Sequence, residues 1–124
     1  MYYDLTKSEK KHARIVMDKG LEKEYREGLK LASEVLDQWH SDRLSMHEAY
    51  MKLIQGLEKI NEGIGYRHNG KGGSRWVEVM ASQLALDYIS EEDLQPFREE
   101  TKKVILILSG KRSMEEQALR VQPG

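Results

Sequence analysis

The chain contains no cysteine among its 124 residues, and it has only two prolines and one phenylalanine. The absence of cysteine excludes a disulfide framework, a thiolate nucleophile and a metal site with cysteine ligands. Long apolar runs are also missing, because the longest covers only residues 104–108. A run of that length is too short to span a membrane or to form the core of a secretory signal. We therefore expect no membrane segment and a cytoplasmic location.

An excess of one charge is lacking as well. Twenty basic and 21 acidic residues give a formal charge of −1 at pH 7, whereas proteins dedicated to nucleic acids depend on strong positive charge. Nucleic acid is therefore not an expected general partner. A composition of 39% hydrophobic and 33% charged residues predicts a folded, well-solvated protein. At this length we expect one helical domain, over residues 1–110, followed by a flexible tail over residues 111–124.

Apolar residues recur at steps of three and four through most of the chain, which is the spacing of one helical face. Between residues 21 and 40 the face consists of Leu21, Tyr25, Leu29, Ala32, Val35, Leu36 and Trp39. Similar patterns predict helices over 46–64, 74–89 and 91–109. A short basic helix that ends or bends at Gly20 is expected before them. The predicted fold is all-α, a bundle of four principal helices preceded by a short basic N-terminal helix.

Polar residues mark the expected helix starts. Ser45 and Glu48 have the spacing of a capping box, in which the hydroxyl and the carboxylate each accept a hydrogen bond from a free backbone N–H. Ser74 and Ser90 are the expected caps of the third and fourth principal helices. The connection between residues 40 and 46 is short, so we expect the first two principal helices to form an antiparallel hairpin.

The segment 63–76 differs from the rest of the chain. It holds five of the ten glycines, three cations and a histidine, and no acid. Glycine amides before a helix start are the ingredients of an anion site, whose hypothetical ligands are Arg67, His68, Lys71, Gly72, Gly73, Ser74 and Arg75. The pattern is not that of a Walker loop, since Gly70-Lys71 is followed by glycine. The interpretation favoured over a site is a soluble connector between two helices.

The histidines do not predict a metal site. His12 and His40 each follow an acid by three residues, a spacing found in carboxylate-bridged metal sites of helical bundles. Such a site also needs inward-facing carboxylates on two other helices, and the apolar faces carry none. His47, His68 and Ser74 have no partner in the sequence that would make them a base or a nucleophile. We predict no catalytic residue, no metal and no cofactor.

The five consecutive apolar residues 104–108 point in all directions around the predicted helix, although a helix of a small bundle normally buries only one side. Two explanations are open. The last helix lies centrally in the bundle, or Leu106 and Ile107 are buried against a second copy of the chain. Trp39 and Trp76 lie on apolar faces and are expected in the core.

No motif is specific enough to indicate a family. The composition favours a non-enzymatic helical protein-interaction or regulatory module, with a protein partner or self-association. The alternative is binding of an anion, a nucleotide or nucleic acid through the glycine-rich cationic loop 63–76. An enzyme with His47 or His68 as its base is a third reading. The loop hypothesis predicts that Arg67, Lys71 and Arg75 converge on one concavity.

Overall fold

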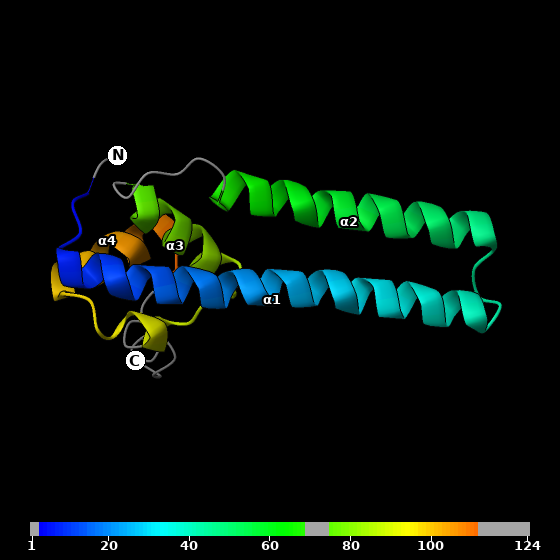
Figure 1. Ribbon diagram of the computed structural model, residues 1–124, viewed down its shortest axis with the longest axis horizontal. Coiled ribbons are helices and arrows are strands. Elements are labelled where there is room, and N and C mark those ends of the chain that lie inside the picture. The colour runs from blue at the N-terminus through cyan, green and yellow to red at the C-terminus, as the bar shows by residue number, and fades with distance from the viewer. Residues whose placement is uncertain (1–2, 69–74, 112–124) are drawn as a thin grey trace, which may run out of the picture. The chain divides into compact units, whose positions relative to one another are not determined.

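The computed structural model describes residues 3–68 and 75–111 (Figure 1). Its elements are α1 (Lys7–His40), α2 (Met46–His68), α3 (Trp76–Ala85), the short 3-10 helix η2 (Glu91–Leu94) and α4 (Glu99–Ser109). These described ranges contain no strand, and the prediction of an all-α fold is confirmed. No helix within them has both the length and the apolarity to cross a membrane.

The chain divides into two compact units. The terminal unit consists of residues 1–20 and 70–124, and the hairpin unit consists of residues 21–69. Helix α1 belongs to both, because its first part lies in the terminal unit and the rest lies in the hairpin unit. The four-helix arrangement within one bundle is not confirmed, and a single domain over residues 1–110 stays a prediction.

Residues 7–40 form one helix, so a separate short basic helix ending at Gly20 is not observed. The glycine instead makes room for a neighbour. A Cβ atom at residue 20 would lie 2.3 Å from Nε2 of Gln83, a fully buried side chain on α3. That Nε2 donates a hydrogen bond to the Met17 carbonyl oxygen at 3.0 Å. Gly20 therefore serves the packing of α3 rather than the end of a helix.

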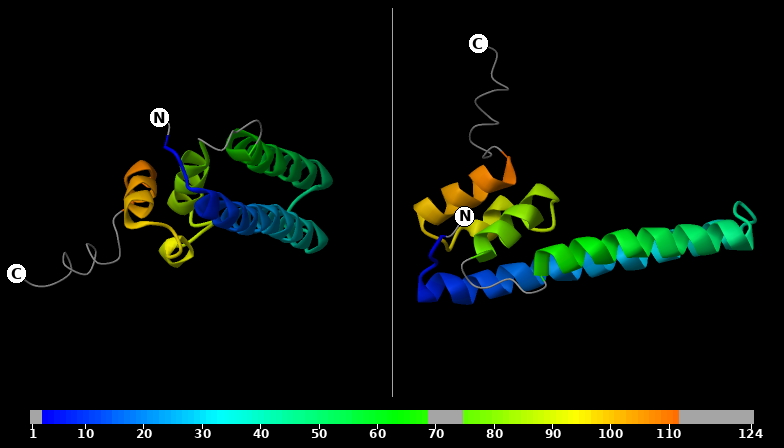
Figure 2. Two further views of the ribbon diagram at one scale, coloured as in Figure 1. Left: turned by 60° about the vertical axis from the view of Figure 1, so that its left-hand side comes forward. Right: turned by 90° about the horizontal axis from the view of Figure 1, so that it is seen from above.

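Helix α3 supplies much of the terminal unit's core, in which α1, α3, η2 and α4 take part (Figure 2). The fully or almost fully buried apolar residues of this core are Leu5, Ala13, Val16, Val77, Met80, Ala81, Leu84, Ile89, Leu94, Phe97 and Ile105. Trp76 packs against this cluster, as expected, and its ring lies 5.2 Å from the guanidinium carbon of Arg14.

Helix α3 ends at Ala85 and not at residue 89 as predicted. Asp87 adopts the left-handed conformation, with φ 63°. The N–H of Tyr88 then donates to the Gln83 carbonyl at 2.9 Å, and the N–H of Asp87 donates to the Leu84 carbonyl at 3.1 Å. This pair of bonds is a Schellman motif, which satisfies the last carbonyls of the helix and turns the chain away.

The predicted helix 91–109 is two elements, η2 and α4. The cap at Ser90 is confirmed, because Ser90 and Asp93 form a capping box at the start of η2. Pro96 follows and has no N–H to continue a helical ladder. Arg98 is extended, with ψ 153°, and becomes the residue from which α4 begins. Its N–H donates to Glu9 Oε2 at 3.1 Å, so a carboxylate on α1 fixes the start of α4.

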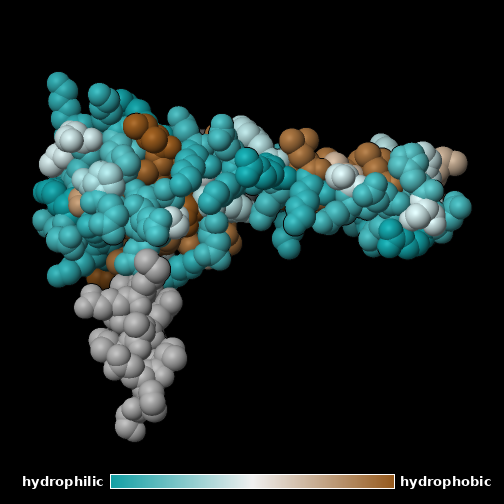
Figure 3. Space-filling model, turned by 90° about the horizontal axis from the view of Figure 1, so that it is seen from below, coloured by the Kyte–Doolittle hydropathy of each residue, from teal (hydrophilic) through white to brown (hydrophobic). Residues whose placement is uncertain are grey.

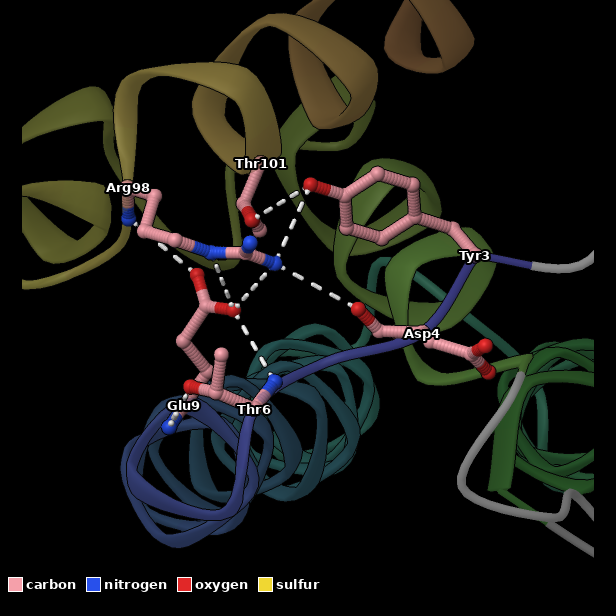
Figure 4. A network of polar contacts seen from close by, with 6 residues as sticks. All are labelled: Tyr3, Asp4, Thr6, Glu9, Arg98 and Thr101. Atoms are coloured by element: carbon pink, nitrogen blue, oxygen red, sulfur yellow. Dashed lines mark hydrogen bonds and ion pairs between the residues drawn. The ribbon is translucent and has the colours of Figure 1, made fainter.

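Glu9, which is buried, is the centre of a polar network (Figure 4). At the start of α1, the Glu9 N–H donates to Thr6 Oγ1 and the Thr6 N–H donates to Glu9 Oε1, both at 3.1 Å. Nε of Arg98 donates to Glu9 Oε1 at 3.0 Å, and Nη2 of the same guanidinium lies 2.9 Å from that oxygen. Tyr3 and Thr101 extend the network, with their hydroxyl oxygens 2.9 Å apart.

This network controls the charge state of Glu9. Burial alone would raise the pKa of the Glu9 carboxyl, but hydrogen bonds from Thr101, Thr6 and Arg98 outweigh it and lower the pKa from 4.5 to about 2. The carboxylate is thus stabilised in its charged form although its side chain is only 4% exposed. A charge this deeply buried persists because it is paired and accepts several hydrogen bonds.

In the hairpin unit, α1 and α2 lie side by side and run in opposite directions, as predicted (Figure 1). A Schellman motif ends α1, with Asp42 at φ 60° and the Arg43 N–H donating to the Gln38 carbonyl. The capping box of Ser45 and Glu48 then begins α2, with both bonds at 3.1 Å. These hydrogen bonds lower the pKa of the Glu48 carboxyl.

Two glycines bring the hairpin helices together. A Cβ at Gly56 would lie 2.2 Å from Leu31 Cδ2, and a Cβ at Gly28 would lie 3.5 Å from Leu57 Cδ2. Each helix therefore presents a leucine to a glycine of the other. This contact also sets the register of the hairpin, with residues 28–31 of α1 beside residues 56–57 of α2.

Alanine at two glycines of α1 should have opposite effects on stability. Gly20→Ala should lower the free energy of unfolding by about 1–3 kcal/mol, because the methyl group overpacks buried Gln83. Gly28→Ala should raise it by about 0.5–1 kcal/mol, because the methyl only reaches ordinary contact distance and alanine favours helix. Urea denaturation measures both. Equal effects of the two changes would contradict the packing role of Gly20.

Glu9→Gln should destabilise the protein by about 2–3 kcal/mol at pH 7. Since the folded pKa of Glu9 lies below its unfolded value, its contribution is complete above about pH 5 and is lost as the pH falls toward 2. The difference between the two proteins in free energy of unfolding should therefore shrink over that acid range. A difference that stays constant from pH 7 to pH 2.5 would show that the carboxylate charge does not matter.

Candidate interaction surface

Helix α1 carries two adjacent rows of residues in the hairpin unit, each with the three-and-four spacing of a helical face. The inner row is Glu24, Gly28, Leu31, Val35 and Gln38, all buried or partly buried. The outer row is Tyr25, Leu29, Ala32, Leu36 and Trp39, one residue further along at each step. Because Gly28 and Leu31 contact α2, the inner row is the one that faces the partner helix.

The outer row of α1 is largely open to solvent. Leu29 is 74% exposed, Tyr25 55%, Leu36 42% and Trp39 36%. Trp39 was expected in the core, and this expectation is wrong. The physical reason is that one neighbouring helix covers only one row, so a second apolar row beside it has no cover within the hairpin unit.

Helix α2 repeats this arrangement. Its inner row runs from Ala49 through Gly56 to Arg67, and its outer row is again one residue further along, with Tyr50, Ile54, Leu57 and Ile64. Tyr50 is 64% exposed, and Met46 beside it is 74% exposed. In an antiparallel pair, a step of one residue on each helix rotates both outer rows toward the same side. The two outer rows therefore share one surface.

We call this surface the hairpin face and define it by the outer row of α1 together with Met46, Tyr50, Ile54, Leu57 and Ile64 of α2. A groove of about 490 Å³ lies near the turn of the hairpin, lined by eight residues that include Leu36, Trp39, Met46 and Tyr50. Figure 3 shows apolar surface along one edge of the hairpin and hydrophilic surface along the other. The groove lining contains no lysine, arginine, aspartate or glutamate, and its polar side-chain atoms are those of His47, Trp39 and Tyr50.

The glycine segment is not a loop from its first residue. Helix α2 continues to His68, so residues 63–68 are helical and the prediction that this helix ends at residue 64 is wrong. A Cβ at Gly63 would lie 2.7 Å from Nη2 of Arg67. The absence of a side chain at Gly63 thus leaves space for Arg67, which folds back along α2 toward α1, as helical side chains do.

Arg67 and His68, two of the predicted anion ligands, both contact Glu24. The guanidinium of Arg67 donates to Glu24 Oε1 from Nε and from Nη2. His68 Nε2 lies 3.1 Å from Glu24 Oε2. Glu24 is fully buried, and Arg67 is 8% exposed. The positive charge of Arg67 is therefore compensated by a carboxylate of the same unit.

The other predicted ligands are described only in part. Lys71, Gly72, Gly73 and Ser74 lie outside the described residues, and with them the predicted cap at Ser74. Arg75 directly precedes α3 and is exposed. The convergence of the cations on one concavity is therefore untested, and the anion site stays a prediction.

The apolar run 104–108 is largely accounted for by the core of the terminal unit. Ile105 is fully buried, and Val104 and Leu106 pack against the same core. Ile107 is 76% exposed. Self-association through Leu106 and Ile107 stays a prediction, for which Ile107 is the accessible residue.

The sequence reading missed Glu24 and the division of α1 into two rows. The inner row is visible in the sequence, because Glu24, Gly28, Leu31, Val35 and Gln38 have the same spacing as the predicted apolar face of residues 21–40. Small and polar residues made the inner row look like a solvent-facing side. Helix periodicity alone does not show which of two adjacent rows is buried against the other helix. The pairing of Glu24 with a distant arginine does show it.

Arg67→Ala should lower the free energy of unfolding by about 3–5 kcal/mol, because it leaves the buried Glu24 carboxylate without its arginine. Arg75→Ala is the matched control, since Arg75 is exposed and its loss should change stability by less than about 0.5 kcal/mol. Replacing the pair together, as Glu24→Leu with Arg67→Met, should recover much of the loss. Similar effects of the two single changes would refute the structural role of Arg67.

Comparison of the chain with protein-family models, with curated proteins and with solved structures finds no match. The chemistry of its own residues is therefore the basis for a function. Within residues 3–68 and 75–111, no three side chains of histidine, aspartate or glutamate are grouped as metal ligands. In that part of the chain, six of the twelve exposed large apolar side chains lie on the hairpin face.

Proposed function

We propose that this protein is a non-enzymatic helical protein-interaction module that binds through the hairpin face. The observation that carries the proposal is the exposed apolar row of α1 together with exposed Met46 and Tyr50 of α2, which lie on the same side of the hairpin. Contiguous apolar surface on a folded protein marks an interaction site, since leaving it in water costs free energy.

The composition of the face supports this proposal. Tyrosine, tryptophan and methionine are enriched at protein interfaces, and the hairpin face offers Tyr25, Trp39, Met46 and Tyr50. These side chains project from helices rather than loops, so little conformational freedom is lost when a partner binds. Active sites, in contrast, combine a pocket with several convergent polar groups, whereas the lining of the groove beside Trp39 is mostly apolar and contains no lysine, arginine or carboxylate.

The remaining sequence predictions complete the proposal. They are a cytoplasmic setting and assembly of the principal helices as one bundle, whereas self-association through α4 and an anion site in loop 63–76 are its alternatives. A bundle could also form at the hairpin face, because two further helices packed against it would cover its exposed apolar residues. No contact among the described residues gives the anion site comparable support.

A comparison of native assemblies tests the proposal. In an extract of the cells that express it, the full chain should elute from a sizing column well above its 14.4 kDa. Leu29→Glu should move it to the monomer position, since the change places a charge on the hairpin face without disturbing any buried residue. Ile107→Glu is the matched control on α4, with 76% exposure against 74% for Leu29, and should leave elution unchanged.

Elution of the unaltered chain as a monomer would remove the basis of the proposal. A complex that survives Leu29→Glu but is lost with Ile107→Glu would move the interaction surface to α4, as the sequence alone suggested.

A further inference from the structure

We infer that the occupant of the hairpin face is a second copy of this chain, with α1 packed antiparallel against the partner's α1 about a two-fold axis near Ala32. The inference rests on the proposed function, because it names the partner of the same surface. Three features of the chain carry it: the symmetry of the outer row, the charges that flank it, and the number of rows to be covered.

The outer row of α1 is nearly symmetric about Ala32. Tyr25 and Trp39 lie seven residues on either side of Ala32, and Leu29 and Leu36 lie three and four residues away. In an antiparallel pair centred on Ala32, Tyr25 of each copy faces Trp39 of the other. Leu29 of each copy faces Leu36 of the other with an offset of one residue. Two alanines meet at the axis, where a small side chain allows close approach of the helices.

The charges beside this row are self-complementary under the same two-fold axis. Glu22, Arg26, Asp37 and His40 are exposed along the outer flank of α1. Reversal of the helix sets Arg26 within one residue of Asp37 of the partner copy, because the two lie six and five residues from Ala32, and it sets Glu22 within two residues of the partner's His40. A parallel pairing would instead set each charge opposite itself, and like charges across an interface oppose binding.

The other two-fold arrangement packs α1 against the partner's α2 and is less favourable. Since residues 28–31 of α1 lie beside residues 56–57 of α2 in the hairpin, it brings Glu22 to within about a turn of Glu62. The α1-to-α1 arrangement avoids this repulsion. It also sets the outer rows of both α2 helices against each other, so that the four rows of two copies are covered together as in an antiparallel four-helix bundle.

Sedimentation of the purified full chain at micromolar concentration tests the inference directly. The expected result is a species of twice the 14.4 kDa chain mass. Leu29→Glu should raise the dissociation constant of the dimer at least about 100-fold, since it buries two carboxylates in an apolar interface. Ile107→Glu should leave it unchanged. Circular dichroism should show equal helix content in all three proteins, which excludes misfolding as the cause.

A single introduced cysteine tests the axis, because the chain has no cysteine of its own. Ala32→Cys should form a covalent dimer through a disulfide with its own copy when oxidised glutathione is supplied. Lys30→Cys, on the opposite side of α1, is the control and should not form one. A dimer that is retained by Ala32→Cys without cross-linking would overturn the proposed axis.

Charge reversal tests the antiparallel register. Arg26→Glu and Asp37→Arg should each weaken the dimer several-fold, because each places two like charges opposite one another. An equimolar mixture of the two variants should form a heterodimer of nearly normal affinity, in which every flanking pair is again of opposite sign. Absence of this rescue would contradict the register.

The outcomes separate this inference from the function on which it rests. A purified chain that is monomeric at all concentrations, while its complex in the extract still depends on Leu29, refutes the second copy and keeps the interaction module. A chain that is monomeric in both settings refutes both.

Discussion

The structure depends on one constraint: two helices packed side by side can cover only one row of residues on each other. In the hairpin unit that row consists of Gly28, Leu31, Gly56 and their neighbours, where a glycine on each helix receives a leucine from the other. The apolar row beside it on α1 and the first residues of the row on α2 are largely uncovered, with Leu29 and Met46 each 74% exposed. In the terminal unit the constraint is met differently, because α3, η2 and α4 approach α1 from several directions and enclose a core. One long helix thus has a covered face in one unit and an open face in the other.

Each unit also contains a buried glutamate of α1 that is paired with an arginine far away in the sequence. Glu9 binds Arg98 at the start of α4, and Glu24 binds Arg67 near the end of α2. Burying such a carboxylate without its partner would cost several kcal/mol, so each pair makes one arrangement of its unit much more favourable than the alternatives. Apolar contacts tolerate sliding by a turn, whereas a buried ion pair does not. These two pairs therefore specify which residues of α1 meet which later element, while the apolar core supplies most of the stabilisation.

Much of the local structure follows from the sequence alone. The capping boxes at Ser45 and Ser90, the hairpin connection and the end of the last helix at Gly110 were predictable, because each depends on a few neighbouring residues. Thr6 and Glu9 have the same spacing and mark the true start of α1. Gly20 and Gly63 misled the prediction, since a glycine that ends a helix and a glycine that admits a side chain such as Gln83 or Arg67 look the same without the tertiary contact. The end of α3 was also hidden, because aspartate instead of glycine takes the left-handed position.

The candidate interaction surface illustrates a further limit of periodicity. The seven residues of the apolar face that the sequence indicates on α1 include Val35, which is buried, and Leu29, which is the most exposed of them. A wide apolar face on a helix is the sum of two narrower rows, and the sequence pattern does not say which neighbour covers each row. In a chain with enough helices around it, both rows would be buried internally. Here α2 covers the inner row, so the width of the face itself implies a second neighbour. The opposite charges of Arg26 and Asp37, six and five residues from Ala32, indicate why that neighbour is the same helix reversed.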